Sequence, residues 1–412
     1  MKQICILGLG YMGLPLACNL AKAGYKVLGV DINKEKIKNL RRKKLETTEP
    51  GLKKLFQIAV GNNNLNFYNK IQPADVFIIA VPTPATNRRI NLKYIKLAAK
   101  MVTQVIQKNN LVILESTVAP NTCKKVIKPI LDQKKTHYFL AHCPERAIPG
   151  NTLYELQNND RIIGGLNKES AKNAKEIYRS FVKGKIYLTD LTTAETVKLL
   201  ENSFRDINIA FANEIAKLSE KININLWEAI ELANKHPRVN ILKPGPGVGG
   251  HCIPIDPWFL IQDEPKAKFI RLAREINDSM PEYIVNCVKK LIKKQKPTIA
   301  ILGVAYKADV DDARETPSSK IICLMQKKGW NIKVTDPYVT KYHLRIMPLE
   351  KALEKTDGAV LVTDHTLYKK FNFKKYSLSF IFDTRNIISE KQLSKETRLI
   401  KFGSNLRSKY HS

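Results

Sequence analysis

The sequence contains no long hydrophobic run and no recognisable export signal. No apolar stretch approaches the ~18–20 residues that a membrane-spanning helix needs. The first residues lead directly into the segment "KQICILGLG", without the apolar region and cleavage site of a secretory leader. We therefore expect a cytoplasmic protein that has no membrane partner.

The cysteines lack the spacing of a disulfide framework or of a zinc site. The chain has seven of them, an odd number, and no two form a CxxC pair. Reduced thiols are therefore expected. Two His-Cys dipeptides occur, His142-Cys143 and His251-Cys252, but adjacent side chains seldom ligate one metal well, so no metal site is predicted.

Acidic residues are scarce beside basic ones, with 38 Asp and Glu against 69 Lys and Arg and a net charge of +31. Such a charge keeps a non-enzymatic, nucleic-acid-associated protein open as a remote alternative. The lysines are spread along the chain, however, and no nucleic-acid-binding motif accompanies them. We expect no nucleic-acid partner, and substrates with several phosphates would explain part of the positive field.

The pattern of apolar segments predicts an α/β protein with more than one domain. At 412 residues the chain has room for two or three domains. Strands and helices alternate at both ends and a long helical stretch lies between them, which predicts two Rossmann-like doubly wound parallel sheets joined by a central helical segment. The expected boundaries are 1–190, 191–295 and 296–412.

A glycine-rich turn near the start carries the signature of a dinucleotide site. "GLGYMG" supplies Gly8, Gly10 and Gly13 between a strand at 3–7 and a helix from about residue 14. These glycines allow a tight turn and close approach to a pyrophosphate, whose charge the helix N-terminus stabilises. The turn therefore predicts a cofactor site, whose expected contacts are Gly8, Gly10, Tyr11, Met12 and Gly13.

The next strand, "KVLGVD", selects between the two nicotinamide cofactors. It ends at Asp31, where a carboxylate would accept hydrogen bonds from the ribose hydroxyls, which favours NAD over NADP. Lys36 lies nearby and could touch the same ribose or its phosphate. Further strands are expected at 74–84, 111–120 and 137–150. Ligands bind at the carboxyl ends of such strands, where Thr83, Thr117 and Glu145 fall.

The central segment predicts a long helix with two distinct stripes. From Val197, apolar residues recur every three or four positions, typical of one buried face. The members of this apolar stripe are Leu200, Phe204, Ile207, Phe211, Ile215, Leu218 and Ile222. Lys198, Asn202 and Arg205 form a separate polar stripe, which would be a solvated face unless another element covers it.

Two loops remain, and each allows two interpretations. "PGPGVGGHCIPIDPWF" (244–259) holds Cys252 among four glycines and four prolines. Alone, it slightly favours a tight turn with a buried thiol over a nucleophile presented at a site.

"GVAYK" (303–307) has a single glycine where a dinucleotide fingerprint has three, so we expect no second NAD there, although Lys307 could hold a phosphate.

Taken together, these motifs resemble the UDP-glucose/GDP-mannose dehydrogenase family over essentially the whole chain. "GLGYMGLP", "VPTP", "EST", "CPER", "K-x-x-x-N", "GGHC-x-x-D" and "GVAYK" follow in the order found in that family. The resemblance implies NAD-dependent four-electron oxidation of a sugar nucleotide, from the C6 alcohol to the carboxylate, with two NAD+ per turnover. It also implies a UDP-sugar-binding C-terminal domain and a homodimer through the central helices.

The resemblance also favours one group of substrates. UDP-glucose dehydrogenases typically carry a lysine between the proline and the aspartate that follow the cysteine, and this chain has Ile255 there. The segments around Asn202 and Cys252 favour UDP-N-acetyl-D-mannosamine as the substrate. Its C2 epimer, UDP-N-acetyl-D-glucosamine, is the alternative.

Site residues follow from the resemblance position by position. Cys252 would be the nucleophile that forms a thiohemiacetal and then a thioester, with Lys198 and Asn202 at the developing alkoxide. Asp256, Glu145 and Thr117 would surround the hydrolytic water. Thr83, Thr117 and Arg314 would also contact NAD. The substrate contacts implied are Arg146, Ala147, Lys198, Asn202, Arg205, His236, Arg238, Gly249, Tyr306, Lys307 and Arg385.

Overall fold

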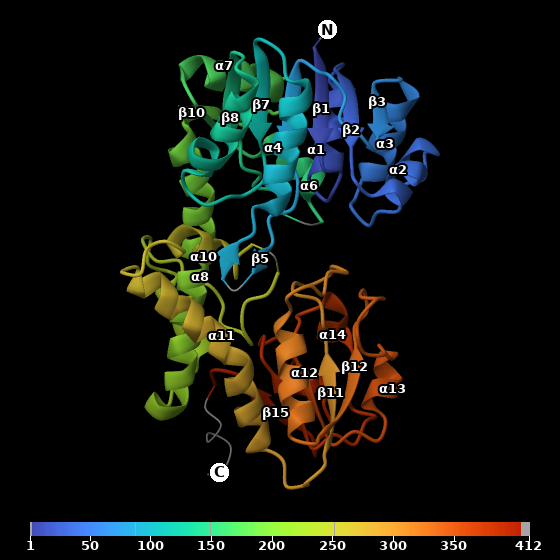
Figure 1. Ribbon diagram of the computed structural model, residues 1–412. Coiled ribbons are helices and arrows are strands. Elements are labelled where there is room, and N and C mark those ends of the chain that lie inside the picture. Colours follow the sequence, from blue (N-terminus) through green and yellow to red (C-terminus); the bar gives the residue numbers. More distant parts are fainter. Residues whose placement is uncertain (1, 87, 149, 251, 405–412) are drawn as a thin grey trace. The chain divides into compact units, whose positions relative to one another are not determined.

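The computed structural model describes residues 2–86, 88–148, 150–250 and 252–404, so His251 of the glycine-rich loop lies outside the described residues (Figure 1). The chain divides into two compact units. The first consists of Met1–Glu201 with Trp258–Gln262, and the second of Asn202–Pro257 with Asp263–Ser412. Each unit has its own sheet and its own hydrophobic cores.

The first unit is built on an eight-stranded sheet in the order β10-β9-β8-β7-β4-β1-β2-β3. The strands are β1 (Gln3–Leu7), β2 (Lys26–Val30), β3 (Leu65–Tyr68), β4 (Val76–Ile79), β7 (Asn110–Leu114), β8 (Tyr138–His142), β9 (Arg161–Gly165) and β10 (Ile186–Asp190). Its helices are α1 (Gly13–Lys22), α2 (Lys34–Arg41), α3 (Leu52–Gly61), α4 (Lys93–Val105), α5 (Lys128–Leu131), α6 (Thr152–Asn158) and α7 (Lys168–Arg179). A short hairpin, β5 (Ala85–Thr86) and β6 (Arg89–Ile90), completes the unit.

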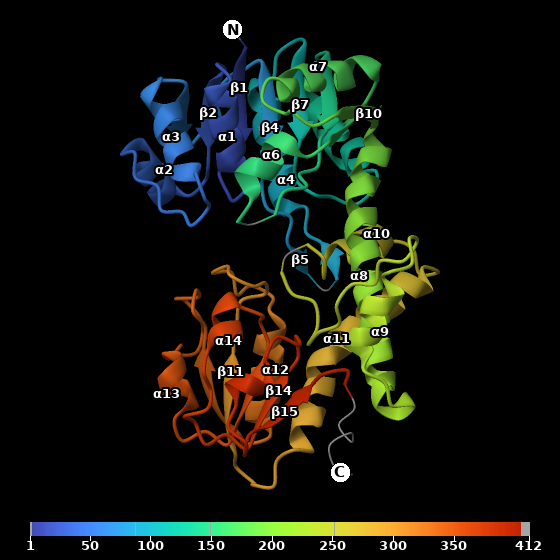
Figure 2. The same ribbon diagram turned by 180° about the vertical axis from the view of Figure 1, so that it is seen from behind.

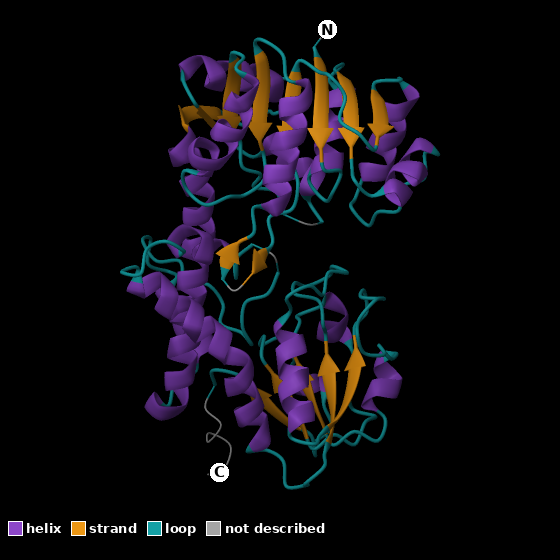
Figure 3. Ribbon diagram, in the orientation of Figure 1, coloured by secondary structure: helices purple, strands orange, loops and turns teal. Residues whose placement is uncertain are grey.

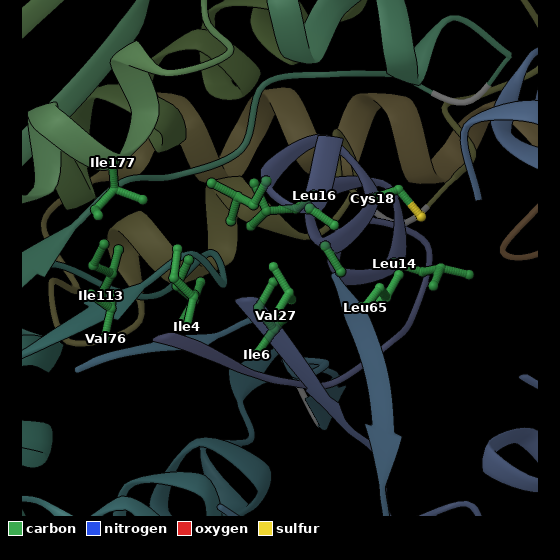
Figure 4. Close-up of a cluster of buried hydrophobic side chains, with 14 of the residues drawn as sticks. Ile4, Ile6, Leu14, Leu16, Cys18, Val27, Leu65, Val76, Ile113 and Ile177 are labelled. Carbon is green, nitrogen blue, oxygen red and sulfur yellow. The ribbon is translucent and has the colours of Figure 1, made fainter. Parts of the chain in front are cut away.

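Strand periodicity explains why this sheet is covered on both faces. Successive side chains of a strand point to opposite faces. In β1, Ile4 and Ile6 pack with α1 and α7 (Figure 4) and also with α3, whereas Cys5 and Leu7 pack with α4 on the other face. A parallel sheet buried on both faces needs such continuously apolar strands.

The predicted fold class is confirmed, with one detail that the sequence did not predict. Neighbouring strands from β3 to β8 run parallel, but β9 pairs antiparallel with β8. The antiparallel direction follows from the connection through α6. After this helix the chain enters β9 at Arg161, which lies at the edge of the sheet where β8 ends. Arg161 Nη2 lies 2.6 Å from Glu145 Oε2 at that edge. β9 therefore starts beside the loop that follows β8.

The long helix is α8 (Leu191–Ile222), and the prediction that its apolar stripe is buried is wrong. Leu200, Phe204, Phe211, Leu218 and Ile222 are all exposed. The polar stripe is the covered one, since Lys198 and Asn202 are buried. Asn202 is covered because Asp256, after the glycine-rich loop, contacts it, as described below, while the apolar face has no cover within the described chain.

The second unit holds a five-stranded, fully parallel sheet in the order β12-β11-β13-β14-β15 (Figure 3). Its strands are β11 (Thr298–Leu302), β12 (Asn331–Thr335), β13 (Gly358–Leu361), β14 (Phe380–Asp383) and β15 (Arg398–Lys401). Helices α11 (Lys268–Lys289) and α12 (Pro317–Lys327) cover one face. The other face packs against α13 (Leu349–Leu353) and α14 (Thr366–Lys370).

Two shorter helices complete the central segment. Helix α9 (Leu226–Ala233) follows α8 and packs against it through the cluster that also contains Ala212 and Ala216 (Figure 2). Helix α10 (Asp256–Ile261) follows the glycine-rich loop. Within the described residues, no helix has the length and apolar character that crossing a membrane requires.

A buried aspartate organises the first turn of the second sheet. Asp336, after β12, accepts hydrogen bonds from the Val304 and Ala305 amides at 2.7 and 3.0 Å and contacts His365 Nε2 at 3.0 Å. Burial alone would raise the pKa of Asp336, but hydrogen bonds from His365 and the Val339 amide outweigh it and lower the pKa to about 2. The ionised carboxylate therefore holds the turn from Gly303 to Lys307 in place.

We predict that Asp336→Asn lowers the free energy of unfolding of the second unit by roughly 2–4 kcal/mol at pH 7, because an amide NH2 would face backbone donors. The wild-type contribution is present above the unfolded pKa of about 4 and is lost as pH falls through the folded value of about 2. Urea denaturation from pH 2 to 7 measures both effects. The exposed control Glu396→Gln should match wild type, and equal stability of Asp336→Asn would contradict the assignment.

Candidate active site

The turn between β1 and α1 has the geometry of a phosphate-binding turn. Gly8 has φ 95°, and a Cβ on it would lie 2.6 Å from the Ala80 carbonyl oxygen. A Cβ on Gly13 would lie 1.9 Å from the Gly8 carbonyl oxygen, so both positions require glycine. Gly10 faces open space, since a Cβ there would meet nothing within 4 Å. No side chain caps the N-terminus of α1, and its first turn has no acid, which suits an anionic ligand.

Asp31 stands at the carboxyl end of β2, where the ribose of a dinucleotide would bind. Its Oδ2 accepts the Leu9 amide at 3.1 Å, and its Oδ1 accepts the Asn33 amide at 2.9 Å. Lys36 Nζ lies 3.5 Å from Oδ2, so the predicted neighbour is an ion-pair partner of Asp31. These contacts fix the carboxylate beside the glycine turn. The turn and Asp31 together fit NAD.

Tyr11, in the middle of the glycine turn, is tied to a distant loop. Its hydroxyl donates to Glu49 Oε2 at 2.5 Å and contacts Thr152 Oγ1 at 2.7 Å. The other oxygen of Glu49 accepts the Thr152 amide at 2.6 Å, and the Gly150 amide donates to Oε2 at 3.0 Å. Glu49 could not be identified from the sequence, because no motif marks it. The network connects the cofactor turn with the chain that follows "CPER".

The loops after β4 and β7 meet through one serine. Ser116 Oγ donates to the Val81 carbonyl at 2.7 Å, which joins "EST" to "VPTP". Thr83 and Thr117, predicted to contact NAD, are both half-buried on these two loops. They therefore lie at the carboxyl edge of the sheet, as expected.

Glu145 is held by three hydrogen bonds and belongs to a buried charge cluster. Its Oε1 accepts the Arg146 and Ala147 amides at 2.6 and 2.7 Å, and its Oε2 contacts Arg161 Nη2 at 2.6 Å. Arg161 also reaches Glu115 Oε1 at 3.2 Å, and the Tyr178 hydroxyl donates to the other oxygen of Glu115. The association of Glu115, Arg161 and Tyr178 could not be predicted from the sequence, because these residues come from the end of β7, from β9 and from α7.

Arg146 is engaged by the central helix. Its guanidinium makes two contacts with the Glu201 carboxylate, Nη2 at 2.6 Å and Nε at 3.2 Å, and Nη1 donates to the Asp160 carbonyl at 2.8 Å. Glu201, three residues after Lys198 on α8, is a further residue that the sequence analysis missed. The contacts with Glu201 and Asp160 fix the position of the guanidinium.

The polar stripe of α8 continues into the second unit. Asn202 is fully buried, and its Nδ2 donates to Asp256 Oδ2 at 2.5 Å. Arg205 donates to the Asn202 side-chain oxygen. The structure thus brings together three predicted site residues, since Asn202 contacts both Arg205 and Asp256, the first residue of α10.

The thiol of Cys252 is exposed, whereas that of Cys143 is fully buried. The interpretation of the glycine-rich loop as a tight turn in which Cys252 is buried is therefore wrong. The Cys252 carbonyl accepts the Ile255 and Asp256 amides at 3.0 and 2.8 Å, which forms the turn that begins α10. Burial raises the pKa of Tyr306 to about 12, with the charges of Asp312 and Cys252 adding to the rise. Cys252 and Tyr306 are therefore close neighbours.

Glycine is required in this loop because Tyr306 lies against it. Gly250 has φ 87°, and a Cβ on it would lie 3.0 Å from the Tyr306 ring. A Cβ on Gly249 would lie 2.8 Å from Pro317. Larger side chains at either position would push Tyr306 or α12 away from the loop.

The remaining predicted site residues of the second unit are the substrate residues Arg385, Lys307, His236 and Arg238 and the NAD contact Arg314. Arg385 Nη1 would lie 2.6 Å from a Cβ at Gly245, so Arg385 lies directly beside the start of the glycine-rich loop. Arg314 makes a two-point contact with Asp312, at 2.8 and 2.6 Å, and Lys307 is exposed. His236 and Arg238 are exposed and contact each other at 3.5 Å.

Comparison with known proteins gives matches along the chain. Three models of the UDP-glucose/GDP-mannose dehydrogenase family match: the NAD binding domain at residues 2–182, the central domain at 192–279 and the UDP binding domain at 300–390. A UDP-N-acetyl-D-mannosamine dehydrogenase of Methanocaldococcus jannaschii is 48% identical over 96% of this chain and 95% of its own. An NDP-N-acetyl-D-galactosaminuronic acid dehydrogenase of Ralstonia solanacearum is 39% identical over 95% and 98%.

Solved structures agree with these relatives. A UDP-D-ManNAc dehydrogenase from Pyrococcus horikoshii aligns with a TM-score of 0.92 at 39% identity, over 97% of this chain and 99% of its own. A UDP-N-acetyl-mannosamine dehydrogenase from Staphylococcus aureus aligns with a TM-score of 0.89 at 38% identity, over 98% of both chains. NAD is therefore the cofactor of the first unit.

We predict that NAD is preferred to NADP by roughly a hundredfold in kcat/KM, because the 2′-phosphate would meet the Asp31 carboxylate. Asp31→Ala should shrink the ratio at least tenfold by removing that repulsion, while Lys36 stays to attract the phosphate. The exposed Glu35→Ala on α2 is the matched control and should keep the ratio. Comparable kcat/KM for both cofactors in wild type would contradict the role of Asp31.

Proposed function

Because the chain belongs to the UDP-glucose/GDP-mannose dehydrogenase family, we propose that it oxidises UDP-N-acetyl-D-mannosamine at C6 to UDP-N-acetyl-D-mannosaminuronate. The overall reaction converts one alcohol, two NAD+ and one water into one carboxylate, two NADH and three protons. NAD accepts the hydride in both oxidations. The chain itself must hold the aldehyde between them and supply a way to release the acid.

The observation that carries the proposal is the exposed thiol of Cys252 in a loop fixed by glycines and prolines. A thiolate that adds to the aldehyde carbon gives a thiohemiacetal, and oxidation of that adduct gives a thioester. Such covalent capture keeps the aldehyde from escaping. The close packing of Gly249 and Gly250 on Tyr306 supports a fixed position for the sulfur.

The other predicted site residues supply the polar groups that this chemistry needs. Asn202 is oriented by its hydrogen bond to Asp256 and by Arg205, so it can donate to an oxygen on the substrate carbon. Lys198, four residues earlier on α8, exchanges the alcohol proton in the proposal. Asp256 and Glu145, with Thr117, act on the water that hydrolyses the thioester.

The choice of sugar rests on the relatives and on one residue. Relatives named UDP-N-acetyl-D-mannosamine dehydrogenase are 48 and 46% identical over nearly the whole chain. Ile255, half-buried between Cys252 and Asp256, stands where UDP-glucose dehydrogenases typically have lysine. NADH absorbance with a panel of UDP-sugars tests the choice. Activity on the C2 epimer alone would replace the sugar, and activity on UDP-glucose alone would overturn the proposal.

We predict that Cys252→Ala lowers acid formation at least a thousandfold while leaving the affinities for NAD and UDP-sugar within about twofold, because the thiol is a small part of either contact surface. Cys323→Ala, which removes the other exposed thiol, is the matched control. NADH production and calorimetric binding measure the two effects. Near wild-type turnover of Cys252→Ala would mean that the thiol forms no covalent intermediate.

A homodimer through the central helices is also part of the proposal. The stripe formed by Leu200, Phe204, Phe211, Leu218 and Ile222 is exposed along α8, and an apolar surface of that extent normally marks an interface. A second copy of the chain would bring the same stripe to the contact, which suits a two-fold axis.

We expect Phe211→Glu to convert the dimer into monomers, because it places a charge in the middle of the apolar stripe. Sedimentation velocity at micromolar concentration measures the state. Leu367→Glu makes the same change at an exposed leucine of α14 and should leave the dimer intact. A wild-type monomer, or a Phe211→Glu dimer, would rule out this interface.

A further inference from the structure

The cluster of Glu145, Arg161, Glu115 and Tyr178 holds two buried carboxylates and one guanidinium. Arg161 is 3% exposed and bridges Glu145 Oε2 at 2.6 Å and Glu115 Oε1 at 3.2 Å. Its guanidinium also lies over the Tyr178 ring at 5.1 Å. With both carboxylates ionised, the cluster would carry a net negative charge in a buried place, which is unfavourable.

Glu145 keeps room for one more hydrogen bond. An ionised carboxylate accepts about four hydrogen bonds. Two backbone amides occupy Oε1 and Arg161 occupies one position of Oε2, so within the described chain one position of Oε2 remains. A water bound there would be oriented by a carboxylate that cannot rotate. The strength of that carboxylate as a proton acceptor depends on how fully Arg161 is engaged with it.

From this geometry we infer that Glu115 and Arg161 are positioning residues for the hydrolytic step, and that the ionisation of Glu115 sets how strongly Glu145 accepts the proton of the attacking water. The inference rests on the proposed function. In the step, water oxygen bonds to the thioester carbon, the carbon–sulfur bond breaks, Cys252 leaves as the thiolate, and the water proton goes to Glu145.

The direction of the effect follows from electrostatics. When Glu115 is neutral, the positive charge of Arg161 acts on Glu145 alone and weakens it as a base. When Glu115 ionises, it shares the guanidinium and adds a negative charge nearby, so Glu145 becomes the stronger base. Hydrolysis should therefore speed up as pH rises through the titration of Glu115.

Glu115 is the neighbour of Glu145 that can gain or lose a proton near neutral pH. Burial raises its pKa to about 7, against the lowering effect of Arg161 and with a further rise from Glu145. The groups that face it are Arg161 from β9, Tyr178 from α7, and Cys143 and Glu145 after β8. Burial raises the pKa of Cys143 to about 12 and that of Tyr178 well above its usual value, so both stay neutral.

The test follows hydrolysis of the acyl-enzyme in Glu115→Gln. The amide keeps the size of the side chain and an oxygen for Tyr178, but it cannot ionise. Enzyme mixed with UDP-N-acetyl-D-mannosamine and NAD is quenched at intervals from pH 6 to 9, and intact mass spectrometry measures the thioester on Cys252. Wild type should hydrolyse faster above pH 7. The variant should lack this rise and be about tenfold slower at pH 8.5 but within twofold at pH 6.

Two further variants keep the inference falsifiable. Tyr178→Phe removes the hydrogen bond that stabilises the ionised form of Glu115, so it should move the rise to higher pH. Glu195→Gln is the control: this glutamate is also buried and accepts two backbone amides, from Asn121 and Cys123, but does not contact Glu145. It should keep the wild-type profile.

The outcomes separate this inference from the proposed function. A wild type that makes no NADH from any UDP-sugar contradicts the proposed function. A wild type that turns over, with the same pH profile in Glu115→Gln and Tyr178→Phe, overturns the inference alone. A rise that disappears in Glu195→Gln as well would also overturn it, because the effect would then be a general response to loss of a buried acid.

Discussion

The position of the Cys252 loop depends on one hydrogen bond, from Asn202 to Asp256. Asn202 is fully buried on α8, where an amide without partners would be costly. It meets this requirement by donating to Asp256 and accepting from Arg205. Asp256 begins α10 and its amide donates to the Cys252 carbonyl, so α8, Asp256 and the Cys252 loop are connected. Asn202 is therefore buried on α8 because it contacts the residue that begins α10 and closes the turn after Cys252.

The same connection explains why the apolar stripe of α8 is the exposed one. A helix can bury only one broad face against its own chain. Here that face carries the buried residues Lys198 and Asn202, and the apolar stripe is exposed. Sequence periodicity identified both stripes correctly, but it could not rank them. Hydrophobicity alone predicts burial of Phe204 and Phe211, and the partner that covers such residues need not be the same chain.

Both sheets have a glycine with positive φ after one strand and an aspartate after the neighbouring strand, but the two aspartates differ in what surrounds them. In the first, Gly8 adopts φ 95° and Asp31, after β2, accepts the Leu9 amide and stays accessible beside an open turn. In the second, Gly303 adopts φ 90° and Asp336, after β12, accepts the amides of Val304 and Ala305. His365 covers Asp336, which leaves no carboxylate for a ribose. The single-glycine turn instead presents Tyr306 to the Cys252 loop.

The parts of the site that the sequence revealed are those encoded by local pattern, and the parts it missed depend on distant pairing. The glycine turn, Asp31 and the Cys252 loop can be recognised in the sequence, because each is marked by the spacing of residues that lie close together in the chain. Glu49, Arg161 and Glu201 gain their roles only when strands and helices far apart in the chain meet. Arg161 is the clearest case. It reaches Glu145 because β9 runs antiparallel to β8, an orientation that no periodicity in "DRIIGG" encodes. Once that strand is reversed, its first residue must lie at the carboxyl edge of the sheet, and a cation placed there contacts both Glu115 and Glu145, the acids that follow the parallel strands β7 and β8.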